Sequence, residues 1–277
     1  MIPIKTKAEI AVMQEGGRVL AQIMEKLKSE VVEGASCLEL DRAACALVFD
    51  SGATPAFKGY IDPHSKNKEP FPSALCVSIN DVVVHGVPSD YILKSGDVVS
   101  LDLGIKYKGF YSDMAITEFV RGQMVQGQTL HHLVQGLPLY QTEDMAENMR
   151  LIRVAKKALK FGISKCHIGN TFGDIGNTIQ RFVESQGFNV VRDLAGHGIG
   201  KALHEDPQIS NYGKRHKGEK IEEGMCFCLE PMITRGNWKL TKTPDGFGYK
   251  TKDGSVACHF EHTISIVNGL PLVLTKL

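Results

Sequence analysis

The sequence has no apolar run long enough to cross a membrane and no excess of charge of one sign. A spanning helix needs about 18 or more apolar residues, and 32 Lys and Arg residues stand against 31 Asp and Glu residues. The segment Met1 to Lys5 lacks the charged-then-apolar layout of a secretory signal. These absences predict a cytoplasmic protein with no membrane or DNA partner.

Disulfide, zinc-ribbon and common nucleophile signatures are also missing. The seven cysteines include one close pair, Cys226 and Cys228, and a zinc ribbon would need a second pair. We therefore expect the cysteines to be reduced. Neither Gly-x-Ser-x-Gly nor Gly-x-x-x-x-Gly-Lys-Ser/Thr occurs, which argues against a serine hydrolase and a P-loop nucleotide enzyme.

The pattern that is present occurs twice. Capping signals at Thr6-x-x-Glu9 and Ser36-x-x-Glu39 predict two helices in the first half. A start near Thr142 and a capping signal at Thr171-x-x-Asp174 predict two more in the second half. The later helix of each pair stops at a glycine, Gly52 or Gly187. Two similar helix pairs indicate two related structural units.

Each helix pair is followed by an apolar strand that we expect to end at a carboxylate. Asp102 follows Gly96 by six residues, and Glu230 follows Gly224 by six. We interpret residues 1–277 as one domain of two pseudo-symmetric halves, about 1–120 and 142–277, that share one sheet system. Ligand clefts are common at such seams, so we expect the site there.

Asp102 and Asp113 lie on two strand-like runs that are joined by residues 106–109. A tight hairpin about Tyr107 and Lys108 would place the two aspartates directly opposite each other, with Cβ atoms roughly 5 Å apart. An isolated pair of this kind usually has one member facing solvent. The repeat of the pattern in the second half favours a metal site instead.

The segment from Ala195 to Pro207 contains three alternating glycines, at 196, 198 and 200. Glycine opposes a stable helix, so His197 and His204 are not two turns of one helical face. We expect the glycines to let the backbone pass close to a metal or a substrate. A lone histidine is more often structural, but this one stands among other candidate ligands.

Taken together, these motifs resemble those of the type I methionine aminopeptidases over nearly the whole chain. The order and the intervals match, apart from a longer gap between Asp113 and His197. The resemblance implies the pita-bread fold, an α+β domain with an antiparallel sheet inside and helices outside. The matching segments are His85-Gly86-Val87-Pro88, Asp102, Asp113, Gly196-His197-Gly198-Ile199-Gly200, His204-Glu205-x-Pro207, Glu230-Pro231-Met232 and Phe260-Glu261-His262-Thr263.

The resemblance implies a centre of two divalent ions, with Co, Mn, Fe(II) or Zn as candidates. Four carboxylates would balance the charge of two dications, and oxygen-rich ligation with one imidazole suits these metals. The implied activity is removal of the initiator methionine from proteins and peptides whose second residue is small, by a bridging hydroxide. The implied metal ligands are Asp102, Asp113, His197, Glu230 and Glu261.

Further roles follow from the same resemblance. Glu230 would move a proton, His204 would stabilise the oxyanion, and His85 would hydrogen-bond the scissile amide. Soft thiols and aromatic edges suit a thioether side chain. The implied substrate-binding residues are His85, His204, Phe57, Tyr60, Phe71, Cys76, Met232 and Phe247. Two positions depart from the common pattern, because Leu203 replaces the usual phenylalanine and Phe247 a frequent tryptophan.

The implied partners are nascent polypeptide N-termini at the ribosome, bound by a monomer. Two alternatives stay open. A proline dipeptidase would keep the fold and the metals and change the substrate. A non-catalytic pita-bread protein would bind peptides or ribosomes, but loss of ligands usually marks that group, and all five are present here.

Two segments are longer than the compact family pattern requires. The segment from Asp62 to Pro70 predicts a surface loop beside the pocket. Residues 121–144 contain an insertion that is rich in glutamine and glycine, and we expect a surface excursion or flap there. The adjacent His131 and His132 would point apart in an extended segment, so we do not expect them to bind one metal.

Overall fold

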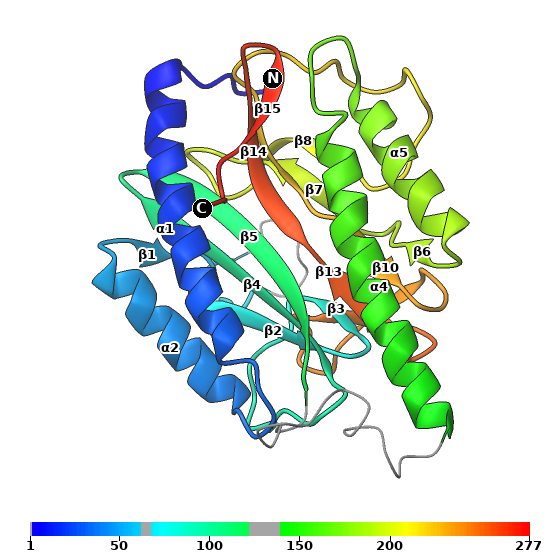
Figure 1. Ribbon diagram of the computed structural model, residues 1–277. Helices are drawn as coiled ribbons and strands as arrows, with labels where there is room; N and C mark the ends of the chain where they lie inside the picture. Colours follow the sequence, from blue (N-terminus) through cyan, green and yellow to red (C-terminus); the bar gives the residue numbers. More distant parts are fainter. Residues whose placement is uncertain (1, 62–67, 122–138) are drawn as a thin grey trace.

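The computed structural model describes residues 2–61, 68–121 and 139–277 (Figure 1). A mostly antiparallel sheet lies at its centre. Its strands are β1 (Thr54–Pro55), β2 (Leu75–Ile79), β4 (Val98–Tyr107), β5 (Phe110–Phe119), β7 (Ala195–Gly198), β8 (Glu205–Ser210), β9 (Cys226–Leu229), β14 (Glu261–Val267) and β15 (Leu270–Val273). The strand order is β1-β4-β5-β14-β9-β7-β8, with β2 paired to β4 and β15 paired to β14. The two central strands, β5 and β14, therefore join the first half of the chain to the second.

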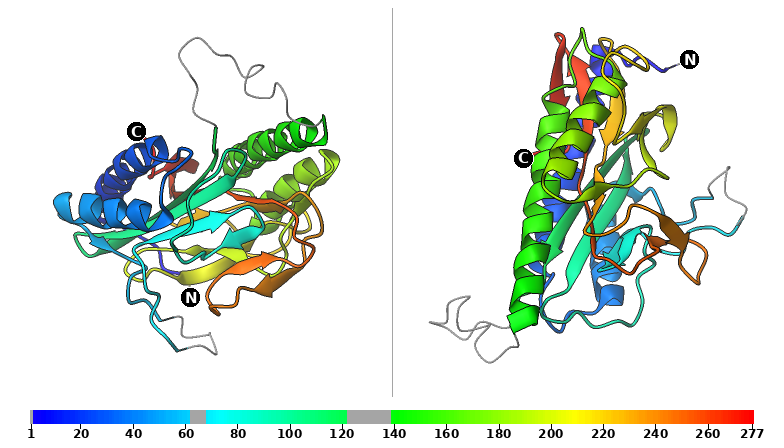
Figure 2. Two further views of the ribbon diagram at one scale, coloured as in Figure 1. Left: turned by 90° about the horizontal axis from the view of Figure 1, so that it is seen from below. Right: turned by 90° about the vertical axis from the view of Figure 1, so that its right-hand side faces the viewer.

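Four long helices cover one face of this sheet, as Figures 1 and 2 show. They are α1 (Lys7–Ser29), α2 (Cys37–Asp50), α4 (Leu139–Ile163) and α5 (Phe172–Ser185). The predicted starts after Thr6, Ser36 and Thr171 are confirmed. The helix α4 begins at Leu139, slightly before the expected start near Thr142. No helix of the described segments is both long and apolar enough to span a bilayer.

Two smaller sheets lie on the other side of the main sheet (Figure 2). Their strand orders are β13-β10-β6 and β11-β12-β3. They supply the segments that surround the site, because β3 ends directly before His85 and β13 ends two residues before Glu261. Their bounds are β3 (Val82–Val84), β6 (Asn189–Val190), β10 (Met232–Thr234), β11 (Leu240–Lys242), β12 (Tyr249–Thr251) and β13 (Ala257–His259).

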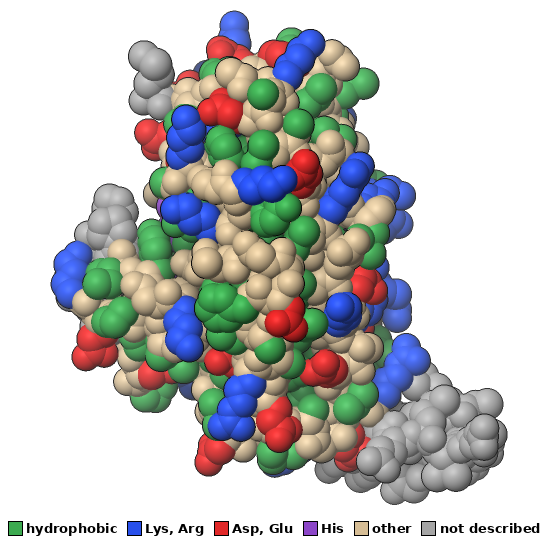
Figure 3. Space-filling view, turned by 90° about the vertical axis from the view of Figure 1, so that its left-hand side faces the viewer, with side chains coloured by type: hydrophobic (Ala, Val, Ile, Leu, Met, Phe, Trp, Pro, Cys, Tyr) green, Lys and Arg blue, Asp and Glu red, His purple; other side chains and the backbone are tan. Residues whose placement is uncertain are grey.

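Each helix pair packs on its own part of the sheet and forms its own apolar core. Leu20, Met24 and Leu101 belong to one buried cluster between the first helix pair and the strands of the first half. Ile179 and Phe227 belong to the corresponding cluster under α4 and α5. This arrangement agrees with the predicted α+β fold of two similar halves. Figure 3 shows Lys and Arg side chains interspersed with Asp and Glu on one outer face.

The β4–β5 hairpin is present, but the register that we expected is wrong. Tyr107 pairs with Phe110, so the turn residues are Lys108 and Gly109, with φ angles of +47° and +88°. Positive φ at both positions is the signature of a type I′ turn, which favours glycine at the second position. The turn therefore lies one residue later than expected, and the two aspartates are not directly opposite each other.

The positions of the two repeated carboxylates also differ from expectation. Asp102 lies in the middle of β4 rather than at its end. Glu230 directly follows the last residue of β9, as expected. The insertion within 121–144 and the loop from Asp62 to Pro70 fall largely outside the described residues, and His131 and His132 lie wholly outside them.

Candidate metal centre

Four neighbouring strands bring the predicted carboxylates into one row across the seam. Asp102 pairs with Ala115 on β5, and Ala115 pairs with Glu261 on β14. The β14–β9 ladder pairs His262 with Leu229, so the same register places Glu261 beside Glu230. Asp113 lies two residues before Ala115 and therefore shares its face of the sheet.

The predicted histidine ligand joins this row from the next strand. The Nε2 atom of His197 lies 3.7 Å from Oε1 of Glu230, and its Nδ1 lies 2.9 Å from the carbonyl oxygen of Gly198. A carbonyl only accepts, so Nδ1 carries the proton and Nε2 keeps its lone pair. Burial, with His204 nearby, lowers the pKa of His197 to about 3. The imidazole is therefore neutral and suited to bind a metal.

The glycines beside His197 allow close packing against other parts of the chain. A Cβ at Gly196 would lie 2.4 Å from the carbonyl oxygen of Cys228, and one at Gly200 would lie 2.4 Å from Cε of Lys5. The close neighbours among the described residues are a backbone carbonyl and a lysine side chain. These glycines let β7 and the following turn pack tightly enough to place His197 beside Glu230.

Burial of the carboxylates makes their charges unfavourable in the absence of cations. Asp102, Asp113, Glu230 and Glu261 are between 2% and 9% exposed. Burial raises the pKa of Asp113 to about 7. Burial first, and then the charge of Asp113, raises the pKa of the other three well above their usual range. A buried cluster of like charges is the environment that a divalent cation stabilises.

Unpartnered oxygens test whether these residues fit a metal. Oδ1 of Asp102 and Oε1 of Glu261 are buried without a hydrogen-bond partner in the described part of the chain. Two sets of donor atoms lie within 4.8 Å of one another: Asp113, His197, Cys228 and Glu261, and Asp102, His259 and Glu261. Oxygen donors with imidazole suit Mn, Fe(II), Co and Zn. The residues therefore fit divalent cations.

Sequence analysis missed two side chains in these sets, Cys228 and His259. Each lies two residues before a predicted ligand, Glu230 or Glu261. Residues two apart on an extended strand face the same side, and this period was the signal that would have found them. Burial lowers the pKa of His259 to about 3 and raises that of Cys228 well above its usual range. Both side chains are therefore neutral.

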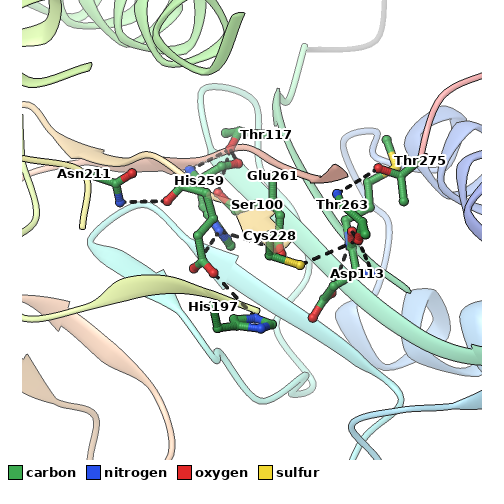
Figure 4. A network of polar contacts seen from close by, with 12 residues as sticks. Ser100, Asp113, Thr117, His197, Asn211, Cys228, His259, Glu261, Thr263 and Thr275 are labelled. Carbon is green, nitrogen blue, oxygen red and sulfur yellow. Dashed lines mark hydrogen bonds and ion pairs between the residues drawn. The ribbon is translucent and has the colours of Figure 1, made fainter. Parts of the chain in front are cut away.

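Two threonines fix the backbone on either side of the centre, as Figure 4 shows. The Thr263 hydroxyl donates to the carbonyl of Asp113 at 2.8 Å and accepts from its N–H at 2.9 Å. The Thr117 hydroxyl donates to the carbonyl of His259 at 2.6 Å and accepts from its N–H at 3.0 Å. These paired bonds hold Asp113 and His259 in fixed register across the β5–β14 seam.

The predicted catalytic histidines lie at the open side of the buried row. His85 and His204 are both exposed. The rings of His197 and His204 lie 4.4 Å apart, and the hydroxyl of Tyr60 lies 2.7 Å from Nδ1 of His204. His204 therefore lies next to the predicted ligand His197, and its Nδ1 lies within hydrogen-bond distance of the Tyr60 hydroxyl. His85 has a φ of +58° and packs edge-on against Tyr249 at 6.0 Å.

A buried ion pair supports the segment that carries His204. Nζ of Lys5 lies 2.5 Å from Oε2 of Glu205, and both side chains are at most 10% exposed. Oε1 of Glu205 accepts from the backbone N–H groups of Lys201 and Ala202. The glutamate of the His-Glu-x-Pro segment thus fixes the turn before His204 and ties it to the start of the chain.

The residues of the implied methionine pocket are brought together only in part. Phe71 and Phe247 pack edge-on with ring centres 5.5 Å apart. Phe57 packs on Gly104, where a Cβ would lie 2.7 Å from its Cε1. Cys76 pairs with Asp102 and so faces the site.

Met232 is buried in a different apolar cluster, beside Val84 and Val191. Its backbone pairs with His259, which lies on the border of the site. Contacts among the described residues therefore support a pocket wall from Phe57, Phe71 and Phe247 more directly than a wall from Met232.

Comparison with known proteins decides the family. The model of metallopeptidase family M24 matches residues 11–268. The chain belongs to this family. The matched region of this M24 metallopeptidase includes all five predicted ligands and both exposed histidines.

Relatives of known name cover the whole chain. It is 38% identical over 275 residues to a methionine aminopeptidase of Clostridium perfringens, with 99% of each chain covered. It is 39% identical to a methionine aminopeptidase of Mycoplasma capricolum, with 100% of this chain and 99% of the relative covered. The resemblance inferred from the motifs is confirmed.

Solved structures agree with the fold. A methionine aminopeptidase of Thermotoga maritima matches with a TM-score of 0.86 and 36% identity over 100% of both chains. A prolidase of Pyrococcus furiosus matches with a TM-score of 0.68 and 22% identity, over 99% of this chain and 65% of the prolidase. The M24 metallopeptidase therefore has the pita-bread fold that these proteins share.

Proposed function

We propose that this M24 metallopeptidase is a methionine aminopeptidase that removes the initiator methionine from proteins and peptides whose second residue is small. The observation that carries the proposal is the row of buried donors across the β5–β14 seam, with unpartnered oxygens on Asp102 and Glu261. Sequence identity of 38% to 39% to proteins named methionine aminopeptidase, over the full chain, supports methionyl peptides as the substrate.

We propose that the five predicted ligands hold two divalent ions. Asp113, His197 and Glu261 belong to one set of converging donors, and Asp102 with Glu261 belongs to the other. Glu230 lies beside the first set, with its Oε1 3.7 Å from Nε2 of His197. The ions, when bound, supply positive charge that acidifies the attacking water and polarises the scissile carbonyl.

The remaining roles are proton transfer, stabilisation of the oxyanion and binding of the scissile amide. Glu230 takes a proton from the attacking water and delivers it to the leaving amine. His204 donates a hydrogen bond to the developing oxyanion. The Tyr60 hydroxyl lies 2.7 Å from Nδ1 of His204, and Nε2 is the nitrogen that we assign to the oxyanion. His85, on the opposite half, holds the scissile amide.

The methionine side chain would lie against Phe57, Tyr60, Phe71 and Phe247, beside Cys76. Aromatic edges and a neutral thiol make favourable contacts with a thioether. The substitution Leu203 is 4% exposed and packs in the cluster below this wall. Leu203 therefore affects the pocket through packing beneath its wall and does not contact the substrate.

We further propose that the chain acts as one monomeric catalytic domain on nascent polypeptide N-termini at the ribosome, in the cytoplasm. Its halves are residues of about 1–120 and 142–277, joined by the insertion. A proline dipeptidase activity is the alternative within the fold, but the relatives that are more than 30% identical over the whole chain are named methionine aminopeptidases.

A peptide panel tests the proposal. The metal-loaded protein is incubated with Met-Ala-Ser, Met-Leu-Ser and the dipeptide Ala-Pro under Mn, Fe(II), Co and Zn in turn, and free amino acids are quantified. We expect methionine from the first peptide and far less from the second. Release from the proline peptide alone would replace the proposal with the dipeptidase reading. No release with any metal would leave a binding protein.

A further inference from the structure

A buried histidine that belongs to none of the predicted roles lies behind two of the proposed ligands. His259 is 2% exposed, and its Nε2 lies 3.7 Å from Oε2 of Glu230 and 3.7 Å from Oε2 of Glu261. Neither ring nitrogen has a hydrogen-bond partner among residues 2–61, 68–121 and 139–277. Burying unpartnered polar nitrogens is unfavourable, so this position requires a reason.

Strand register makes His259 the counterpart of Asp113. Ala115 pairs with Glu261 at the seam, and Asp113 and His259 each lie two residues before one member of this pair. Each is clamped by a threonine of the other strand through the same two backbone bonds. His259 therefore occupies, in the second half, the place that a proposed metal ligand occupies in the first.

A third bond at each threonine repeats as well. The Ser100 hydroxyl lies 2.8 Å from Oγ1 of Thr117, and Sγ of Cys228 lies 3.6 Å from Oγ1 of Thr263. Both threonine protons are already donated to backbone carbonyls, so the serine and the cysteine are the donors. The backbone of His259 is thus as firmly placed as that of Asp113, and Figure 4 shows its ring directed toward the ligand cluster.

The two oxygens of Glu230 face two different imidazoles. Oε1 faces Nε2 of His197, which carries the lone pair, and Oε2 faces Nε2 of His259. Carboxylate oxygens only accept hydrogen bonds. A proton on Nε2 of His259 would therefore stabilise the oxygens of Glu230 and Glu261 that face this ring and leave their other oxygens for the ions.

We propose that His259 is a positioning residue of the metal centre, whose Nε2–H donor orients the carboxylates of Glu230 and Glu261. This inference rests on the metal site of the proposed function. Hydrogen-bond partners of metal ligands fix the orientation of those ligands, and their loss commonly weakens metal affinity by about 10- to 100-fold. His259 acts through the two glutamates and does not contact substrate.

Two amide variants separate this role from simple packing. A glutamine side chain carries its amide nitrogen about as far from the backbone as Nε2 of histidine, whereas an asparagine reaches only as far as Nδ1. His259→Gln and His259→Asn both place an amide in the space of the histidine ring. Only the glutamine carries an N–H donor at the position of Nε2. His262→Gln is the matched control, because His262 points away from Glu261 and bonds Thr275 at 2.9 Å.

The measurement is Mn(II) affinity of the full-length, metal-stripped protein by isothermal titration calorimetry, with circular dichroism to verify folding. We expect H259N to weaken the affinity by about 10- to 100-fold, and H259Q and H262Q to stay within about threefold of the original protein. If H259N does not fold, H259M replaces it, since methionine matches glutamine in length and lacks a donor.

Two results would overturn the proposal. Unchanged affinity in H259N would remove His259 from the centre. Equal weakening in H259Q and H259N, with a changed visible spectrum of the Co(II)-loaded protein, would make Nε2 a direct ligand together with Asp102 and Glu261. Failure of the proposed function would be seen in a different measurement. The unchanged chain would not cleave methionyl peptides even at full metal occupancy.

Discussion

The two halves of this molecule share one strand register but fill it with different side chains. Asp102 on β4 and Glu230 after β9 occupy equivalent positions, and both are carboxylates. Asp113 corresponds to His259, and Ala115 to Glu261. The duplicated framework therefore fixes where donors lie, while the identity of each donor is set separately in each half.

The halves also differ in how the strands are connected. In the first half one unbroken hairpin with a type I′ turn carries Asp102 and Asp113. In the second half, Glu230 and Glu261 belong to segments that are separate in sequence. Glu230 directly follows β9, whereas Glu261 begins β14, which Phe260 separates from β13. The first pair is positioned by local pairing, whereas the second depends on the assembled sheet.

Each half contributes one His-x-x-Pro segment to the open side of the site, starting at His85 and at His204. The residue after His204 is Glu205, which forms the buried ion pair with Lys5, whereas Gly86 follows His85. The segment of the second half is thus anchored by charge, and that of the first half by close packing, since a Cβ at Gly86 would lie 2.3 Å from the carbonyl oxygen of Val77.

The largest expected effect separates the two equivalent carboxylates. Glu230→Gln should lower kcat by about 10³-fold or more at every Mn(II) concentration, because it removes the proposed proton carrier. Asp102→Asn should weaken metal binding yet recover much of its activity at high Mn(II). The check is kcat on Met-Ala-Ser across a metal titration. Equal recovery of both variants would show that Glu230 acts only as a ligand.

The next effect concerns the stability of the metal-free protein. Burial raises the pKa of Asp113 from its usual 3.8 to about 7, so its stabilising contribution is present at low pH and is lost as pH rises through 7. Its counterpart His259 has a pKa lowered to about 3 and acts in the opposite direction, but only below about pH 6.5. Unfolded histidines still lose protons above about pH 6.5, so the contribution of Asp113 is the difference between the unchanged chain and Asp113→Asn.

Between about pH 6.5 and 8 in EDTA, Asp113 should lower the free energy of unfolding by about 1 kcal/mol as the pH rises, because most of its loss of stability falls between about pH 4 and 7. Asp113→Asn should flatten the decline, and added Mn(II) should abolish it in the unchanged chain. Urea unfolding at several pH values measures this. A decline that is identical in the variant would assign the effect to the other carboxylates.

Sequence reasoning reached the frame of the site because helix and strand signals are local. The capping signals at Thr6 and Thr171 and the glycine stops depend on a few neighbouring residues, and the structure confirms them. The five predicted ligands come from the resemblance of the motif series to a known family. The predicted hairpin register is wrong because the turn lies at Lys108 and Gly109, where glycine takes the positive φ of +88° that this turn requires.

Other parts of the centre could not be predicted in this way. Cys228 and His259 carry no motif, and only the two-residue period of their strands relates them to ligands. The ion pair between Lys5 and Glu205 joins residues at distant points of the chain, and no local pattern indicates it. Contacts across the seam arise from tertiary packing, which one sequence does not specify.

A moderate effect compares the two exposed histidines. His204→Ala should lower kcat by about 10²-fold with metal content intact, because it removes the oxyanion donor. His85→Ala should affect KM as much as kcat, since holding the amide acts on bound substrate as well as on the transition state. Steady-state kinetics with metal analysis measures both, and a fully active H204A would remove His204 from the mechanism.

Tyr60→Phe sharpens this comparison. It keeps the aromatic ring of the pocket and removes only the hydroxyl that lies 2.7 Å from His204. We expect a loss of about tenfold in kcat with KM for methionyl peptides nearly unchanged. A rise in KM alone would mean that Tyr60 serves the pocket and not His204.

The smallest expected effect tests the helix caps of the two halves. Thr6 and Glu9 bond reciprocally at 2.9 Å and 3.3 Å on an exposed surface. The hydroxyl and N–H of Thr171 both bond Asp174, which is 5% exposed and also accepts from the N–H of His216. Removing the Thr171 hydroxyl therefore leaves the buried carboxylate of Asp174 with one donor fewer. At the exposed cap of α1, water replaces the hydroxyl of Thr6.

We expect Thr171→Ala to cost about 1 to 2 kcal/mol of unfolding free energy and Thr6→Ala about 0.5 to 1 kcal/mol. Urea unfolding of the metal-loaded protein, followed by circular dichroism, resolves the difference. Peptide cleavage should be unchanged in both, because neither threonine approaches the carboxylate row. A larger cost for T6A would mean that the start of α1, next to the Lys5 ion pair, limits stability more than the cap of α5.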